Sequence, residues 1–251
     1  MSGRRAKAKR RAVEVHPLHN HANRIIATAE RVLALDLSHI PLTRPIQFYI
    51  GWMRAAFDQS RVIATLTAGD LAHAAAPNRR AFAEIALRLL WLRSLEAPSR
   101  TKALEQMIAR EKELTTGFYE TLAEMGIDHD VDLSAMDKVV AEVIDDRALR
   151  QQVKAVTDAA KAAPVTAGLY SAWREETQYT HATAHLAVAY ALEEPADTLG
   201  QGSPPMQHAD LSTHHMVCLL VGMLTAELVK DEGVADEAVL PIVFATWDAT
   251  D

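Results

Sequence analysis

Residues 168–192, GLYSAWREETQYTHATAHLAVAYAL, form the stretch that most constrains the fold. In a helix of 3.6 residues per turn, positions three and four apart share a face. That spacing places Tyr170, Trp173, Thr177 and His181 on one mostly apolar stripe, with His185 at its edge. The stripe therefore predicts a helix whose inner face carries a hydroxyl and an imidazole into the core. Buried polar groups need hydrogen-bond partners, so this helix is the first candidate for a functional site.

The composition favours helix over strand along the whole chain. Of the 251 residues, 49% are hydrophobic, while Gly and Pro number only 10 each. Few helix breakers and abundant Ala and Leu are typical of helical proteins. Apolar stripes at helical spacing recur along the sequence, and no segment shows the alternation of a strand. We expect an all-α fold, a single irregular bundle of about seven or eight helices over residues 18–251.

Charge is distributed unevenly along the chain. Residues 1–11 hold six basic residues and no acidic one, whereas the formal net charge of the whole chain is −7. We expect residues 1–17 to be a disordered basic tail, whose charge suits contact with nucleic acid or an acidic partner. The acidic remainder argues against a broad nucleic-acid-binding face.

The single cysteine and the length of the apolar runs bear on the cellular setting. Cys218 has no cysteine to pair with, and its apolar surroundings indicate an inert core thiol. The longest apolar run, residues 216–226, falls well short of the roughly 20 residues that cross a bilayer. We expect a cytoplasmic protein with no membrane segment and no cofactor, which associates with an unidentified protein partner or with itself.

Arg80 and Glu84 form a second candidate pair. They lie four residues apart on a predicted helix over residues 78–95, close enough for an ion pair. Leu87, Trp91 and Leu95 continue the same stripe. Burial of an ion pair costs desolvation that mutual attraction only partly offsets. We therefore expect this pair either to fix the register of the helix or to hold a ligand.

His181 and His185 have the spacing with which one helix can hold a metal ion. The metalloprotease pattern has Glu directly after the first His, whereas Ala182 follows here. A third ligand would come from elsewhere in the chain, with Glu84, Glu176 and Asp210 as candidates and His214 and His215 as further possibilities. The competing interpretation is that both are hydrogen-bonded core histidines.

An enzymatic interpretation is the alternative to a binding role. Helical ribonucleases of the HEPN type use an Arg-x-x-x-x-His motif, and this chain has that spacing at Arg11 and His16, inside the predicted tail. In a hydrolase or ribonuclease with a toxin or phage-defence role, His181 would act as general acid–base. Arg80 would stabilise developing negative charge, and Glu84 would orient either His181 or Arg80.

Residues 68–92 and 170–185 carry two short motifs. The first is Arg80-x-x-x-Glu84, which opens a long apolar helix and is followed by Trp91; the second is Tyr170, then Thr177, then His181 four positions later. Both resemble a bacterial all-helical family described as a domain of unknown function, in which serine is usual at the threonine position. The resemblance implies an all-helical fold in which these two helices pack together.

These patterns converge on one expected polar cluster of Arg80, Glu84, Thr177 and His181, held between two core helices. The leading hypothesis is a non-enzymatic helical protein that acts through a protein partner or a small ligand. The cluster would be either a structural lock or part of a ligand pocket.

Overall fold

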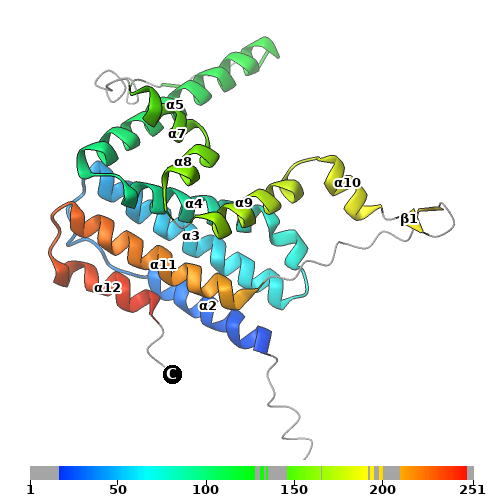
Figure 1. The fold of residues 1–251 in the computed structure, drawn as a ribbon, viewed down its shortest axis with the longest axis horizontal. Helices are drawn as coiled ribbons and strands as arrows, with labels where there is room; N and C mark the ends of the chain where they lie inside the picture. Colours follow the sequence, from blue (N-terminus) through cyan, green and yellow to red (C-terminus); the bar gives the residue numbers. More distant parts are fainter. Residues whose placement is uncertain are drawn as a thin grey trace, which may run out of the picture.

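The computed structural model describes residues 17–127, 131–132, 134, 146–164, 166–191, 193–194, 198–199 and 210–247. The fold is all-α (Figure 1), and the described residues form ten α-helices where seven or eight were expected. The predicted basic tail lies outside the described residues, except that Pro17 begins the first helix.

The elements, in chain order, are α2 (Pro17–Leu33), α3 (Arg44–Ala68), the 3₁₀ helix η1 (Ala72–Ala75), α4 (Ala76–Ser94), α5 (Ala97–Glu124), α7 (Arg147–Lys154), α8 (Val156–Ala162), α9 (Ala167–Thr180), α10 (Ala184–Tyr190), β1 (Glu193–Glu194), β2 (Thr198–Leu199), α11 (Leu211–Asp231) and α12 (Asp236–Thr246). The strands β1 and β2 pair in antiparallel fashion.

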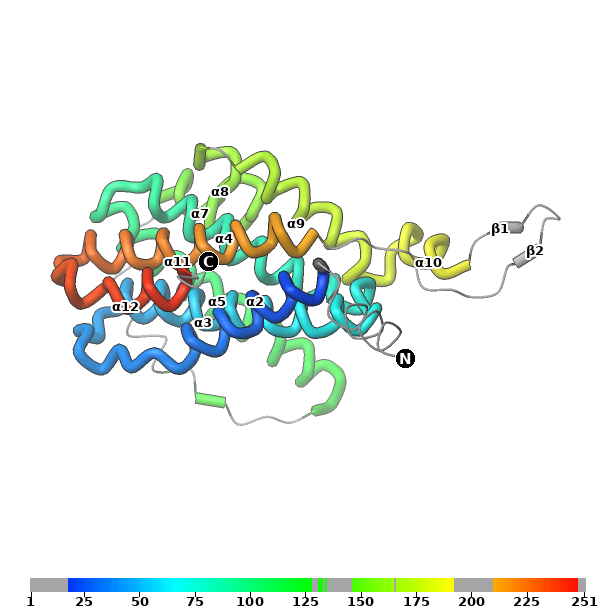
Figure 2. The backbone as a smooth tube through the Cα atoms, turned by 90° about the horizontal axis from the view of Figure 1, so that it is seen from below, coloured from blue at the N-terminus to red at the C-terminus, as the bar shows by residue number. Residues whose placement is uncertain are grey.

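Helices α2, α3, α4, α11 and α12 form the main bundle, in which α11 packs against the other four (Figures 1 and 2). Its largest fully buried side chains include Tyr49, Phe57, Trp91 and Leu228. Local sequence sets the start of two of these helices. The Thr43 hydroxyl accepts a hydrogen bond from the first turn of α3, and Asp210 caps α11 in the same manner.

A second layer, built from α5, α7, α8 and α9, covers α4 on the side away from α12 (Figure 1). The sequence pattern of residues 134–158 predicts one helix, with a possible break near residues 145–146. The described part of that stretch contains two helices, because Asp146 caps the start of α7 and Ala155 is extended between α7 and α8. Residues 135–145 lie outside the described residues.

The predicted helix over residues 168–192 is also two helices. Helix α9 ends at Thr180, and His181 is extended, with φ −119° and ψ 159°. The break has a local cause in Thr183, whose hydroxyl accepts from the Leu186 amide (3.1 Å) and donates to the Gln178 carbonyl (2.7 Å). One side chain therefore caps the start of α10 and satisfies a terminal carbonyl of α9, which stabilises the interruption.

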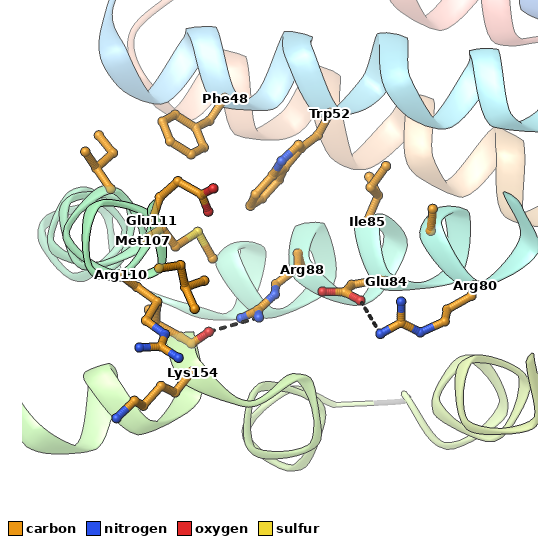
Figure 3. Close-up of a pocket in the computed structure, with 14 residues that line it drawn as sticks. Phe48, Trp52, Arg80, Glu84, Ile85, Arg88, Met107, Arg110, Glu111 and Lys154 are labelled. Carbon is orange, nitrogen blue, oxygen red and sulfur yellow. Dashed lines mark hydrogen bonds and ion pairs between the residues drawn. The ribbon is translucent and has the colours of Figure 1, made fainter. Parts of the chain in front are cut away.

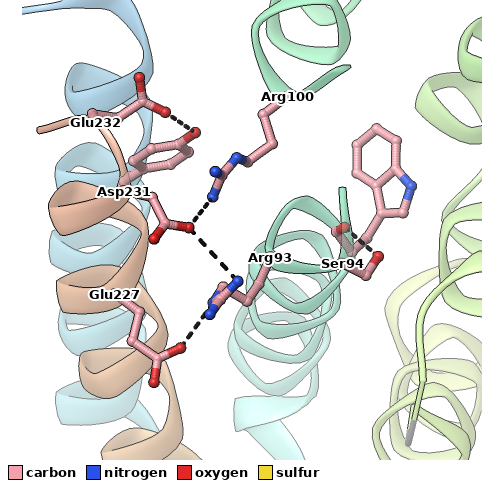
Figure 4. A network of polar contacts seen from close by, with 8 residues as sticks. Arg93, Ser94, Arg100, Glu227, Asp231 and Glu232 are labelled. Carbon is pink, nitrogen blue, oxygen red and sulfur yellow. Dashed lines mark hydrogen bonds and ion pairs between the residues drawn. The ribbon is translucent and has the colours of Figure 1, made fainter. Parts of the chain in front are cut away.

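A network of polar contacts ties the end of α11 to its neighbours (Figure 4). The Asp231 carboxylate accepts from Arg100 at 2.7 Å and lies 3.6 Å from the Arg93 guanidinium. The Tyr49 hydroxyl donates to Glu232 at 3.3 Å. Burial of the phenol, next to Glu232, raises the pKa of Tyr49. These contacts join α3, α4 and α5 to the C-terminal end of α11.

Helix α11 has the length and apolarity of a membrane-crossing segment, judged by composition alone. One face of it, which includes Cys218, Val221 and Leu228, is buried in the bundle. A core helix passes the same composition test, so this feature is weak evidence for a membrane span. The predicted core position of Cys218 is confirmed: its thiol lies 3.4 Å from the Ser60 hydroxyl.

Candidate functional site

Helices α4 and α9 pack together and bring four of the predicted site residues into contact. Arg80 Nε donates to Thr177 Oγ1 at 3.3 Å, and the Thr177 hydroxyl donates to the Trp173 carbonyl at 2.8 Å. Trp173 Nε1 donates to Glu84 Oε2 at 3.1 Å. The Arg80 guanidinium also lies over the Trp173 ring, 5.7 Å from its centroid. The result is a closed set of contacts between the two helices.

Tyr170 extends this arrangement toward α8. Its ring stacks on Trp173, with centroids 5.7 Å apart and an interplanar angle of 30°. Its hydroxyl lies 3.2 Å from the Thr157 hydroxyl, so the pair forms a hydrogen bond. Trp173 in turn packs with Ala83, Leu87 and the α8 residues Val156 and Ala160 in a small apolar cluster of its own. This packing fixes the orientation of the indole that Glu84 accepts from.

Arg80 and Glu84 are less buried than the sequence predicted. Their side chains are 32% and 33% exposed, and the nearest charged atoms lie 3.9 Å apart. The expectation of a pair held away from water is therefore wrong. The two side chains instead stand at the edge of the α4–α9 interface, where one side of each reaches solvent and the other contacts α9.

His181 does not join the cluster. Helix α9 ends at Thr180, so His181 does not continue the helical stripe that was predicted to place its imidazole in the core. Its side chain is exposed. Its ring makes no hydrogen bond or ion pair within the described part of the chain. The predicted four-residue cluster is therefore a set of Arg80, Glu84, Trp173 and Thr177.

The histidine pair is no better placed for metal binding. His185 is exposed on α10 and packs edge-on against Tyr179, with centroids 5.0 Å apart. The three carboxylates proposed as third ligands are engaged elsewhere: Glu84 accepts from Trp173, Glu176 pairs with Arg79, and Asp210 caps α11. Across the described residues, no group of three His, Cys, Asp or Glu side chains is arranged to hold a metal ion.

A second ion pair at the same interface was not predicted. Arg79 Nε and Nη2 donate to the two carboxylate oxygens of Glu176 at 2.6 Å and 2.9 Å. The two side chains are only 13% and 15% exposed. No local spacing marks this pair in the sequence, because its two residues are 97 positions apart.

The Arg80–Glu84 pair lies in the wall of a pocket of about 720 Å³ between α3, α4, α5 and α7 (Figure 3). Phe48 and Trp52 of α3 form an aromatic wall, with their rings edge to face at 5.6 Å and 84°. Ile85 of α4 and Met107 of α5 add further apolar surface. Pockets of 300–1,000 Å³ with mainly apolar walls and a few polar groups are typical of small-molecule sites.

Four cationic side chains line this pocket, Arg80, Arg88, Arg110 and Lys154, against two carboxylates. Figure 3 places Arg110 and Lys154 at one end and Arg80 at the other, with Arg88 between them. Arg88 donates to the carbonyls of residues 152 (3.0 Å) and 153 (2.9 Å), so it anchors the end of α7. Burial lowers the pKa of Arg88.

The remaining cations differ in how far they are already paired. Arg110 pairs with Glu113 at 2.8 Å. Lys154 is exposed and has no ion-pair partner among the described residues. Arg80 uses Nε for Thr177 and Nη2 for the long contact with Glu84, which leaves Nη1 without a partner in the described structure. Among the described residues, the pocket therefore presents unpaired cationic hydrogen-bond donors at both ends, Arg80 Nη1 and the Lys154 ammonium.

No protein-family model, curated protein or solved structure matches this chain, so no family is identified or excluded. What the site can do is inferred from its own geometry.

Proposed function

We propose that this protein is a non-enzymatic binding protein, and that the pocket between α3, α4, α5 and α7 takes a small organic anion with an apolar body. The observation that carries the proposal is the combination of an aromatic wall with cations at both ends of one 720 Å³ pocket. A protein partner, the other half of the initial hypothesis, has less support because these groups face into a concave site.

Charge favours an anionic ligand. The chain has a formal net charge of −7, so a pocket in which cations outnumber carboxylates four to two runs against the average of its surface. A guanidinium or ammonium group donates charge-assisted hydrogen bonds to carboxylate, sulfonate or phosphate oxygens. Arg80 and Lys154 have the donors free for this contact, one at each end of the site.

The apolar walls favour a ligand that is more than a bare anion. Phe48 and Trp52 present ring edges and faces to the pocket, and Ile85 and Met107 present aliphatic surface. Burial of apolar ligand surface contributes about 25 cal/mol per Å². An aromatic or aliphatic body would therefore supply most of the affinity, and the anionic group would fix the orientation.

The α4–α9 contacts give Arg80 its place in this scheme. The Nε bond to Thr177 and the stacking over Trp173 hold the guanidinium at the edge of the pocket before any ligand arrives. Preorganised donors lose less side-chain entropy on binding. Thr177, Trp173 and Glu84 thus act as positioning residues, which unites the lock and pocket versions of the original hypothesis.

The hydrolase alternative has less support. It assigns the general acid–base to His181, which is exposed at the end of α9 and contacts neither Arg80 nor Glu84. General acid–base catalysis needs the base within hydrogen-bond reach of the reacting group. The Arg11–His16 spacing of the ribonuclease version lies outside the described residues.

A titration with anilinonaphthalene sulfonate (ANS), an aromatic anion whose fluorescence rises in apolar sites, tests the proposal. We expect saturable binding to the full chain. Arg80→Gln should weaken it about tenfold, because a hydrogen bond to a charged group contributes roughly 1.5–3 kcal/mol. Trp52→Leu should weaken it as well, through loss of the aromatic wall.

The matched control is Arg61→Gln. Arg61 lies on α3, pairs with Asp58 at 2.7 Å and does not line the pocket, so the variant removes one positive charge at a distance. It should bind ANS as the unaltered chain does. Equal affinity in the Arg80 and Arg61 variants, or binding that does not saturate, would show that the pocket does not select anions.

A further inference from the structure

We propose that a second cavity, of about 590 Å³ between α4, α9 and α11, binds an uncharged apolar molecule that carries one hydrogen-bonding group. Its walls include Phe82 of α4, Leu169 and Ala172 of α9, and Val217 and Leu220 of α11. The Arg80–Glu84 pocket shares none of these residues. The inference therefore stands independently of the first pocket.

The cavity has a simple origin in the packing of the bundle. Helices α9 and α11 each pack against α4. Between α9 and α11, apolar side chains of both helices line the cavity, and Phe82 and Ala83 of α4 form its floor. Ala172 and Gly168 have little or no side chain to fill this space, so the cavity stays open. An apolar molecule would supply the contacts that these two faces lack.

The charged groups in the wall already have hydrogen-bond or ion-pair partners within the protein. Arg79 and Glu176 form the two-bond ion pair at 2.6 Å and 2.9 Å. The Asp210 carboxylate accepts from the amides of Ser212 and Thr213 and from the Thr213 hydroxyl. An ionised ligand would bring an unpaired charge into an apolar space, which is costly. The cavity thus selects against ions, in contrast to the Arg80–Glu84 pocket.

One polar side chain in the wall has no partner. The His214 ring packs on Phe82, with centroids 4.3 Å apart and an angle of 48°, and its Nε2 atom is buried without a hydrogen bond. Burial, with Arg79 nearby, lowers the pKa of His214 to about 4, so the ring is neutral at pH 7. A neutral imidazole can donate from one nitrogen and accept at the other. A small rotation of the ring would expose Nε2 to the cavity, where a hydroxyl, amine or carbonyl of the ligand would satisfy it.

N-phenyl naphthylamine (NPN) is the matched probe, because it has the aromatic frame of ANS and one N–H but no sulfonate. We expect NPN to bind this cavity at least tenfold more tightly than ANS does. Arg80→Gln should leave NPN affinity unchanged, and the variants described next should leave ANS binding in the first pocket unchanged.

Two variants close the cavity without disturbing the core. Ala172 is exposed, so Ala172→Phe fills the space from its open side. Gly168→Leu does the same from the start of α9, where an added Cβ meets no atom within 4 Å. Each should lower NPN affinity at least tenfold. Ser171→Phe, an equally large change at an exposed α9 position outside the cavity wall, is the control and should have no effect.

His214→Phe separates a ligand-binding histidine from a merely structural one. It keeps a ring against Phe82 but removes both nitrogens, so NPN affinity should fall about fivefold while the melting temperature holds or rises. Loss of affinity in the Ala172 or Gly168 variant, with the Ser171 control unaltered, supports the cavity. NPN binding that all three α9 variants leave unchanged, or that ANS matches, overturns the proposal. An unchanged affinity in His214→Phe overturns the hydrogen-bonding part.

Discussion

Replacement of Glu176 by glutamine should release α9 from α4. The Arg79–Glu176 pair is 13% and 15% exposed and joined by two short hydrogen bonds. Removal of one partner from a buried pair leaves the other charge uncompensated, at a cost of about 3–5 kcal/mol. Because some solvent still reaches both side chains, we expect the lower end of that range, about 3 kcal/mol.

The neighbouring pair supplies a matched comparison within the same interface. Arg80 and Glu84 are about a third exposed, with 3.9 Å between the charged atoms. Exposed pairs contribute roughly 0–1 kcal/mol. Glu84→Gln also keeps an oxygen that can accept from Trp173 Nε1. The same chemical change, made at Glu176 and at Glu84, should therefore differ in cost by about 2 kcal/mol or more.

Hydrogen exchange of the α9 amides is the suitable assay, since the pair holds one helix onto the bundle and local opening has its own free energy. A loss of 3 kcal/mol corresponds to about a hundredfold faster exchange in α9, because 1.36 kcal/mol is a factor of ten. Glu84→Gln should change the rate by about fivefold or less. Amides in the buried part of α11 should be unaffected in both variants.

A double variant guards against a trivial explanation. Arg79→Met with Glu176→Leu removes both charges and replaces them by apolar side chains, which is often neutral or stabilising at a buried pair. It should recover most of the protection lost in Glu176→Gln. If the double variant exchanges as fast as the single one, or if Glu176→Gln and Glu84→Gln are equivalent, the ion pair does not hold α9 in place and this reasoning is refuted.

Three further predictions concern the core. Gly222→Ala should destabilise the protein by about 1–3 kcal/mol through overpacking, because the added Cβ would lie 2.2 Å from Thr246 Cγ2. Gly51→Ala should stabilise it by about 0.5–1 kcal/mol, because an added Cβ there meets no atom within 4 Å. Thermal melts of the two variants compare these effects. The free energy of unfolding of the unaltered chain should fall by up to about 3 kcal/mol between pH 6.5 and pH 4, because His214 protonates at a higher pH in the unfolded state than in the folded state. Denaturant titrations of His214→Phe should not show this loss. Parallel pH profiles for the two proteins would contradict the prediction. Cys218, whose pKa burial raises to about 12, should react with a thiol reagent only after unfolding; rapid labelling of the folded chain would show it accessible.

The helices were predictable where local signals set them. Thr43 and Pro45 precede and open α3, and Gly126 lies just past the end of α5 with φ +77°. Caps of this kind act through hydrogen bonds within a few residues, so they can be recognised in a single sequence. The fold class followed from the composition and from the helical spacing of the apolar residues.

The break at His181 shows where that approach fails. The apolar stripe continues through residues 184–192, so periodicity predicted one long helix. The competing signal was Thr183, whose hydroxyl caps the start of α10 by accepting a hydrogen bond from the Leu186 amide. A threonine in the middle of a stripe can face outward, bond within its own helix or interrupt it, and periodicity alone does not distinguish these outcomes. The predicted role of His181 depended on that choice.

The partners of the arginines were beyond local pattern for a different reason. Arg79 and Arg80 are adjacent, so they point about 100° apart around α4. Their environments depend on where α9, α5 and α11 lie around that helix, which follows from long-range packing. Spacing favoured Arg80 because Glu84 is four residues away, while the buried partner of Arg79 is 97 residues distant.

That angular difference gives a physical basis for the opposite ligand preferences that we propose for two sites on one helix. At one edge of the α4–α9 interface, Arg79 pairs with Glu176, and the other charged group of the adjoining cavity, Asp210, accepts hydrogen bonds from the start of α11. At the other edge, Arg80 contacts the uncharged Thr177 hydroxyl and lies 3.9 Å from Glu84, so its Nη1 donor remains available to the first pocket. Under the two proposals, the residue opposite each arginine, an acid or an alcohol, would set the charge of the ligand that each site accepts.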